Sequence, residues 1–333
     1  MGADCNCAEA AEVEFVVITG RRTKWNRIAA SQTATAVAYA ACVLIWGTTW
    51  FAIKLSLVGM PPLFGAGVRF IIAGLVLYAF AFALRVNVRR EAPPWRLVAV
   101  LALTMFGLNY ALTYVAETHL ASGLVAVLFG TMPFFIFGFA HVLIGERADR
   151  RTIAGALLAL GGVAVISLVG NVQGDLGYIV AALVAAASSA FANVYLKRFA
   201  HEHPLATLPP AMLLAGIGLA ALGLGFEHVD WQRASAPVPL AALAYLAVCG
   251  SAVAFYCNHW LLQRITSGAM GLSALMIPVM AVAVGALFGG EVFGVRDIVG
   301  ALLVIGGVWL SLGRRAPSKQ PRVASAAASQ AVA

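Results

Sequence analysis

Two apolar stretches near the start of this 333-residue chain hold side chains that bind ligands in other contexts. In one, Trp46, Trp50 and Lys54 recur every four residues, so on a helix they share a stripe. In the other, Arg69 lies within a run that follows Pro61-Pro62. Ionisable groups inside such runs are costly and usually face a bundle interior or a wet cavity. Arg69 is therefore a candidate for contact with a ligand.

A third apolar stretch carries a polar and aromatic stripe over residues 109–117. Two interpretations stay open, namely hydrogen bonds between helices and the lining of a pathway. The residues concerned are Asn109, Tyr110, Thr113, Tyr114 and Glu117.

Two prolines near the middle of later apolar runs predict kinked helices that flex around a central site. They are Pro133 and Pro278. The full set of candidate substrate-binding residues is Trp46, Trp50, Arg69, Asn109, Tyr110, Tyr114, Met132, Pro133, Asn193, Phe255 and Pro278.

Lys54 and Glu117 end their helices on the side where Arg69 lies, so they are candidates for charge coupling. One carboxylate facing two bases leaves a positive excess, which would attract a substrate carboxylate or let Glu117 exchange partners. The alternative ties Arg69 to helix-end carbonyls and lets Lys54 extend into water.

Composition predicts an all-α polytopic membrane protein. The chain is 62% hydrophobic and 11% charged, with a mean hydropathy of +0.90, whereas soluble domains are about 25% charged. Period-two alternation is absent, so the spans are helices. Ten runs are long enough to cross a bilayer: about 35–55, 62–84, 97–117, 121–144, 152–170, 176–196, 205–225, 238–260, 268–288 and 297–313.

The net charge of +8 is distributed as membrane topology predicts, which argues against nucleic acid as a partner. If the N-terminus is cytoplasmic, 18 of the 22 Lys and Arg lie in cytoplasmic segments and two lie outside. This bias predicts a multi-pass protein of the inner membrane with both termini in the cytoplasm. Residues 1–30 and 315–333 are expected to be a disordered leader and tail.

Residues 122–167 recur as residues 267–312 after a shift of 145 positions, with 14 identities in 46 positions. Equivalent positions in the two copies are separated by five membrane spans. Because five is odd, the second copy crosses the membrane in the opposite direction. The sequence therefore predicts two inverted five-helix repeats, 31–170 and 171–314. Each copy has a Gly-Glu pair, expected to serve the next helix N-terminus rather than catalysis. The repeated glycines predict packing within the chain or a homodimer. These residues are Gly145-Glu146, Gly290-Glu291, Gly155, Gly161, Gly162, Gly300, Gly306 and Gly307.

These features, in this order, resemble the EamA-type proteins of the drug/metabolite transporter superfamily over about residues 35–313. The resemblance rests on residues 46–54, Pro61-Pro62 with Arg69-Phe70, and the doubled Gly-Glu, Gly-Ala-Leu-Leu and Gly-Gly-Val. It implies ten helices in inverted repeats and a central cavity lined by the first, third, fourth, sixth, eighth and ninth helices. It also implies, commonly, export of small metabolites, amino acids or drugs.

The leading hypothesis is therefore a secondary transporter, with a small-molecule substrate and the lipid bilayer as partners. The chain lacks a phosphate-binding Gly-x-x-x-x-Gly-Lys-Ser/Thr motif. The alternatives are an accessory subunit and, less favoured, an intramembrane enzyme, for which neither Gly-x-Ser-x-Gly nor His-Glu-x-x-His is present. No cofactor and no metal site is predicted.

Overall fold

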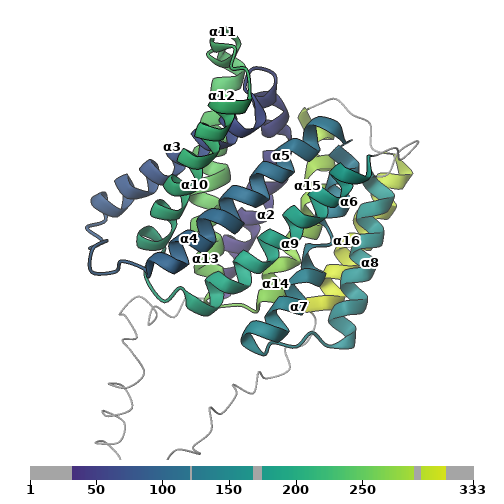
Figure 1. Cartoon of the computed structure of the whole chain (residues 1–333). Helices are drawn as coiled ribbons and strands as arrows, with labels where there is room; N and C mark the ends of the chain where they lie inside the picture. Colours follow the sequence, from purple (N-terminus) through teal and green to yellow (C-terminus); the bar gives the residue numbers. More distant parts are fainter. Residues whose placement is uncertain (1–31, 121, 168–174, 289–293, 313–333) are drawn as a thin grey trace, which may run out of the picture.

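The structure, a computed structural model, describes residues 32–120, 122–167, 175–288 and 294–312 (Figure 1). Within them every regular element is helical. The expected leader and tail, and the predicted Gly290-Glu291 pair, lie outside the described residues. The elements are α2 (Gln32–Leu57), α3 (Pro62–Ala83), α4 (Trp95–Leu101), η2 (Ala102–Leu108), α5 (Asn109–His119), α6 (Ser122–Phe129), α7 (Met132–Ile144), α8 (Arg150–Ser167), α9 (Leu176–Phe199), α10 (Pro204–Phe226), α11 (Trp231–Ala234), α12 (Pro237–Ala247), η3 (Val248–Val253), α13 (Ala254–Leu262), α14 (Ser267–Gly271), α15 (Ser273–Phe288) and α16 (Val295–Leu312).

Seven helical stretches in the described part of the chain are long and apolar enough to cross a membrane, and each matches a predicted span. The predicted spans 268–288 and 297–313 correspond to shorter apolar helices, Ser267–Met280 and Ile298–Leu312. The predicted span 152–170 corresponds to α8, which begins with two arginines.

The two prolines differ in their effect on the helices, for which the sequence predicted matching kinks. Before Pro133 the α-helix is interrupted for two residues, between the end of α6 at Phe129 and the start of α7 at Met132. Pro133 thus lies in the first turn of α7, where a backbone N–H would have no partner within the helix and its absence costs no hydrogen bond. Pro278 lies inside α15, and the nearby break is at Leu272.

The internal repeat is visible in the helix boundaries. A shift of 145 positions carries both ends of α8 onto both ends of α16. The same shift carries η2 onto residues 247–253, which coincide with η3 apart from one residue. These two elements are π-helical, a conformation that is rare and often found at functional sites. No local pattern in the sequence predicts either of them.

Helices α8 and α16 pack against each other through the repeated glycines. A Cβ on Gly155 would lie 2.5 Å from the carbonyl oxygen of Gly307, and one on Gly162 would lie 2.6 Å from that of Gly300. Residue numbers rise along α8 in the direction in which they fall along α16, so the two helices are antiparallel. Four of the six repeated glycines therefore serve packing within the chain, while a Cβ on Gly161 would meet nothing within 4 Å.

The repeated arginines close the same pair of helices at both ends. Arg151 Nε, in the first turn of α8, donates to the Leu310 carbonyl at 3.2 Å near the end of α16. Arg296 Nε, in the first turn of α16, donates to the Val165 carbonyl at 2.5 Å near the end of α8. Each arginine thus satisfies carbonyls that have no partner within their own helix.

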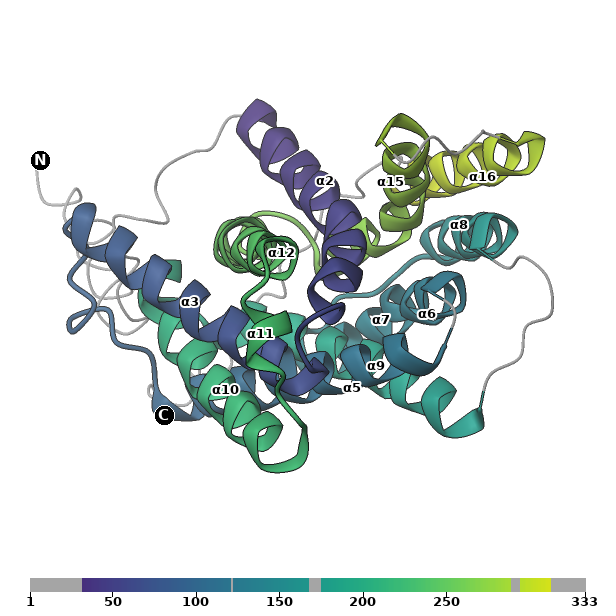
Figure 2. The same cartoon turned by 90° about the horizontal axis from the view of Figure 1, so that it is seen from above.

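Two antiparallel pairs, α8 with α16 and α3 with α10, lie at opposite edges of the molecule (Figure 2). Close approach in the second pair depends on Gly67 against Ala220 and Gly223 against Phe64. Between the pairs, helices from one half pack on helices from the other: α2 contacts α15, α12 and α13, and α9 contacts α7 and α5. When the two halves are exchanged, the contacts of α2 with α15 and α13 correspond to the contacts of α9 with α7 and α5.

Glu146 serves a helix start, but not that of α8 as predicted. Its carboxylate accepts from the Ser267 backbone N–H at 2.9 Å, where α14 begins. The start of α8 is served by Asp149, which accepts from the Thr152 N–H at 2.7 Å. Hydrogen bonds from Thr152 hold the pKa of the Asp149 carboxyl below its usual value.

We predict that Gly162→Ala and Gly161→Ala have opposite effects on stability, although they are adjacent. Alanine is favoured over glycine in a helix by about 1 kcal/mol, and Gly161 has room for it. At position 162 the methyl group would meet the backbone of α16, so the helices must separate. Thermal unfolding of the detergent-solubilised protein should show a lower midpoint for Gly162→Ala alone. Equal midpoints would contradict this packing.

Candidate functional site

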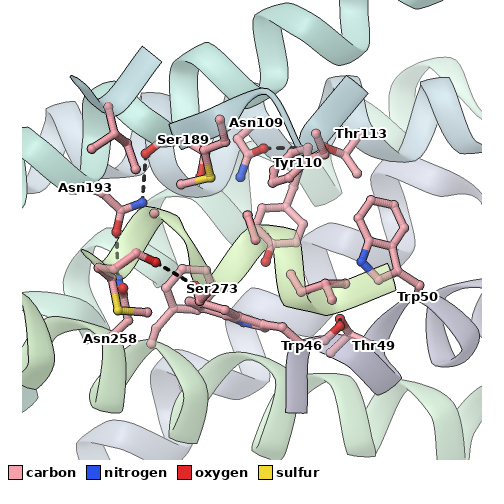
Figure 3. Close-up of a pocket in the computed structure, with 18 of the residues that line it drawn as sticks. Trp46, Thr49, Trp50, Asn109, Tyr110, Thr113, Ser189, Asn193, Asn258 and Ser273 are labelled. Carbon is pink, nitrogen blue, oxygen red and sulfur yellow. Dashed lines mark hydrogen bonds between the residues drawn. The ribbon is translucent and has the colours of Figure 1, made fainter. Parts of the chain in front are cut away.

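A cavity with an empty volume of about 750 Å³ lies between the two halves of the chain (Figure 3). The first half contributes residues of α2, α5, α6 and α7, together with Arg69 of α3. The second half contributes residues of α9, α13, α14 and α15. These are the helices that the resemblance implied, with α3 in addition.

Eight of the candidate binding residues line this cavity, and three do not. Those in the wall are Trp46, Trp50, Arg69, Asn109, Tyr110, Met132, Asn193 and Phe255. Outside the wall are Tyr114, Pro133 and Pro278, and also the two charge-coupling candidates, Lys54 and Glu117.

Helical rotation explains why the two charged ends of the stripes miss the cavity. Each residue turns an α-helix by about 100°, so eight residues leave a side chain about 80° from where it began. Lys54 is eight residues beyond Trp46 and is exposed, whereas Ile53, seven residues beyond, stays in the wall. Glu117 is likewise eight residues beyond Asn109. The expected cluster of Lys54, Glu117 and Arg69 therefore does not form.

Arg69 is buried, with a side chain 1% exposed, and joins three elements. Its Nε donates to the Ser251 hydroxyl at 2.7 Å, and a terminal nitrogen donates to the Gly250 carbonyl at 3.3 Å. The other terminal nitrogen donates to the Tyr114 hydroxyl at 3.3 Å. Tyr114 thus lies behind the cavity wall and holds the arginine that forms part of it.

The charge of Arg69 faces neutral groups. Among the described residues, no carboxylate lies within the 4.0 Å of an ion pair. The guanidinium carbon lies 4.8 Å from the centroid of the Tyr110 ring, whose face attracts a cation. Gly250 permits the approach, because a Cβ there would lie 2.8 Å from Thr49 and 3.3 Å from the guanidinium.

A chain of amides forms another part of the wall (Figure 3). Asn193 Nδ2 donates to the Ser189 carbonyl at 2.8 Å, and Asn258 Nδ2 donates to Asn193 Oδ1 at 2.9 Å. Because a backbone carbonyl only accepts, the chain fixes both amide orientations. Asn258 Oδ1 is left buried and, within the described residues, has no hydrogen-bond partner. It is available to accept from an N–H of a ligand.

Aromatic rings form the apolar surface between the arginine and the amides. The Phe255 ring lies 5.7 Å from Trp46 and 6.3 Å from Tyr110, both in edge contacts. Trp50 makes an edge contact with Phe129 at 6.0 Å. The site therefore combines one buried cation, hydrogen-bonding amides and aromatic faces, which suits a small organic molecule with a charged or polar group.

Several wall residues were not among the candidates. Five of them follow the three- and four-residue spacing of stripes already recognised, so a stricter helical count would have found them. They are Thr49, Ile53, Thr113, Ser189 and Asn258. The remaining residues lie on α6, α7, α14 and α15, around the interruptions of the two helices that contain the prolines. Those wall residues are Phe129, Ile136, Met270, Gly271, Ser273, Ala274 and Ile277.

Together, the apolar helices define a multi-pass membrane protein with a cavity between two related halves. The model of the EamA-like transporter family matches this chain twice, over residues 34–168 and 176–313. The chain belongs to the EamA-like transporter family and is a membrane transporter, which confirms the resemblance found in the sequence.

Known proteins match this chain over most of its length and over most of their own. The uncharacterized inner membrane transporter YedA of Escherichia coli K12 is 29% identical over 292 residues, covering 85% of this chain and 92% of YedA. A probable amino-acid metabolite efflux pump of Salmonella typhimurium is 26% identical over 282 residues, covering 81% and 92%. One solved crystal structure shares the fold, with a TM-score of 0.75 and 22% identity over 85% of this chain and 97% of that one.

We predict that Arg69→Lys lowers the free energy of unfolding by roughly 1–3 kcal/mol, since the ammonium cannot serve all three acceptors and leaves buried groups unsatisfied. Tyr114→Phe removes one 3.3 Å partner and should cost less. Thermal unfolding of the purified variants checks both. An Arg69→Lys protein as stable as wild type would show that the three hydrogen bonds carry little weight.

Proposed function

We propose that this chain is a secondary transporter that exports a small organic molecule by alternating access between two inverted five-helix repeats, residues 31–170 and 171–314. The cavity between the two halves carries this proposal, because both repeats contribute to one binding site. A site at the repeat interface is the plan of many secondary transporters. Export as the direction is supported by the name of the Salmonella relative, a probable amino-acid metabolite efflux pump.

The packing of α8 on α16 supports the inverted arrangement. These helices are equivalent in the repeat, and they are antiparallel. Two copies with the same orientation would place equivalent helices parallel. Arg151 of α8 binds the end of α16, and Arg296 of α16 binds the end of α8. These two contacts follow the same two-fold relation.

The distribution of basic residues supports ten spans with cytoplasmic termini in the inner membrane. On this assignment the α3–α4 connection is cytoplasmic, and the segment from Glu227 to Ala236, which contains α11, is periplasmic. Asn87 and Gln232 are exposed in these two segments.

We predict that Gln232→Cys, but not Asn87→Cys, reacts with a membrane-impermeant thiol reagent added to intact cells. Each substitution is made in a variant whose five native cysteines are replaced. Asn87→Cys should react after the membrane is opened, which controls for its accessibility. The reverse pattern would overturn the proposed orientation.

The chemistry of the wall supports a substrate with an anionic group, an N–H donor and an apolar part. Arg69 supplies a positive charge without a carboxylate partner among the described residues, and a carboxylate is the group its planar fork suits. Asn258 Oδ1 supplies the acceptor, and Trp46 and Phe255 supply the apolar contact. Apolar amino acids and their derivatives fit this description.

We predict that proteoliposomes containing only this protein exchange an apolar amino acid such as phenylalanine, and discriminate against its decarboxylated amine. The two compounds share the ring and the amino group, so the comparison isolates the carboxylate. Counterflow of labelled compound measures the exchange, and empty liposomes are the control. Equal exchange of both compounds would reject selection by Arg69, and exchange of neither, nor of any other small metabolite tested, would reject the proposed transport.

A further inference from the structure

The ends of three helices from both halves are joined by one carboxylate and one ammonium group. Glu146 Oε1 lies 2.7 Å from Lys197 Nζ, which also donates to the Ile265 carbonyl at 2.6 Å. Glu146 Oε2 accepts from the Ser267 N–H at 2.9 Å. We call these four residues, Glu146, Lys197, Ile265 and Ser267, the latch. It lies at the lower end of the molecule in Figure 1, where α7, α9 and α14 meet.

The latch lies one helical turn beyond the cavity wall on two of its helices. Asn193, in the wall, precedes Lys197 by four residues on α9. Gly271, also in the wall, follows Ser267 by four residues on α14. Any ligand that leaves the cavity toward this end must pass between helices that the latch holds together.

Helix α14 is the element that the latch holds at its first residue. It has five residues and is followed by a one-residue interruption at Leu272 before α15. A hydrogen bond from the Tyr39 hydroxyl to the Ala269 carbonyl at 3.1 Å ties it to α2. It also packs on α7 of the first half and on α9, α13 and α15 of the second.

A second lysine lies near the opposite end of the molecule. Lys54 on α2 is four residues beyond Trp50 of the cavity wall and is exposed. The Lys197 side chain, by contrast, is 19% exposed and bonded to two groups.

We propose that the latch is the gate at the α7–α14 end of the cavity, and that transport requires the Glu146–Lys197 pair to break. This proposal rests on the alternating access proposed above. With the pair intact, α7, α9 and α14 stay together and this end is closed. When it breaks, α14 separates from α7 and the cavity opens toward this end. Lys197 and Glu146 are positioning residues, since neither is part of the cavity wall.

The test measures access to a cysteine in the cavity wall, Ala274→Cys, in a protein whose native cysteines are replaced. A membrane-impermeant maleimide is applied to inside-out and to right-side-out vesicles without substrate. Glu146→Gln and Lys197→Gln should each raise the labelling rate from the latch side by about tenfold, as expected for the loss of one charge-assisted hydrogen bond, and lower it from the other side. The double variant should match either single variant, because one bond is lost in each.

Two further variants control for charge and position. Lys197→Arg keeps the charge and should label like wild type. Lys54→Gln removes a lysine near the other end and should leave labelling from the latch side unchanged. Unchanged labelling in well-folded Glu146→Gln and Lys197→Gln proteins would overturn the proposal, and so would an equal increase in Lys54→Gln.

A cross-link tests the gate even if the charge variants do not fold. Glu146→Cys with Ser267→Cys, joined by a short reducible cross-linker, should block transport until the cross-link is reduced. Full transport by the cross-linked protein would reject the latch while leaving the proposed function intact. Conversely, the expected labelling changes in a protein that transports no compound tested would support the latch and reject the proposed function.

Discussion

Backbone carbonyls that leave the helical hydrogen-bond pattern within a bilayer need a donor from the protein, since lipid offers none. In this chain basic side chains supply that donor at the irregular points of the fold. The pairs are Arg69 with Gly250, Arg151 with Leu310, Arg296 with Val165, and Lys197 with Ile265. A π-helical segment, two helix ends and the connection before α14 are each stabilised in this way. These four basic residues therefore have a structural task, whatever else they do.

These contacts divide into a symmetric set and an asymmetric one. Arg151 and Arg296 make the same contact on equivalent helices, and the glycines between them allow α8 and α16 to approach along their length. Because the same contact is made at both ends of the α8–α16 pair, it favours neither end of the molecule. Such a pair suits a part of the structure that stays fixed. Lys197 joins α9 to Glu146 and to the connection before α14, so this contact acts at one end of the molecule. A conformational change that exchanges the ends has to act on contacts of the second kind.

The helices and most of the cavity could be predicted from the sequence because apolar runs and four-residue spacing report directly on helix faces. The misses have geometric causes. Lys54 and Glu117 extended their stripes by one residue too many, since an error of about 80° accumulates over eight residues. Pro133 marked the interruption between α6 and α7, but proline alone does not say whether a helix bends or stops. The partner of Glu146 is more than a hundred residues away in the chain, so it leaves no local pattern in the sequence.

Arg69 shows how closely a structural role and a binding role can resemble each other. Of the two alternatives considered from the sequence, attachment to a backbone carbonyl is observed, whereas contact with a ligand stays a prediction. Its hydrogen bonds to Ser251, Gly250 and Tyr114 are those a purely structural arginine would make. What they leave is an unbalanced charge, since neutral acceptors offset the cost of burying a cation less well than a carboxylate does. An anion bound beside Tyr110 would supply the missing counter-charge, so the same burial that fixes three helices also favours a negatively charged ligand.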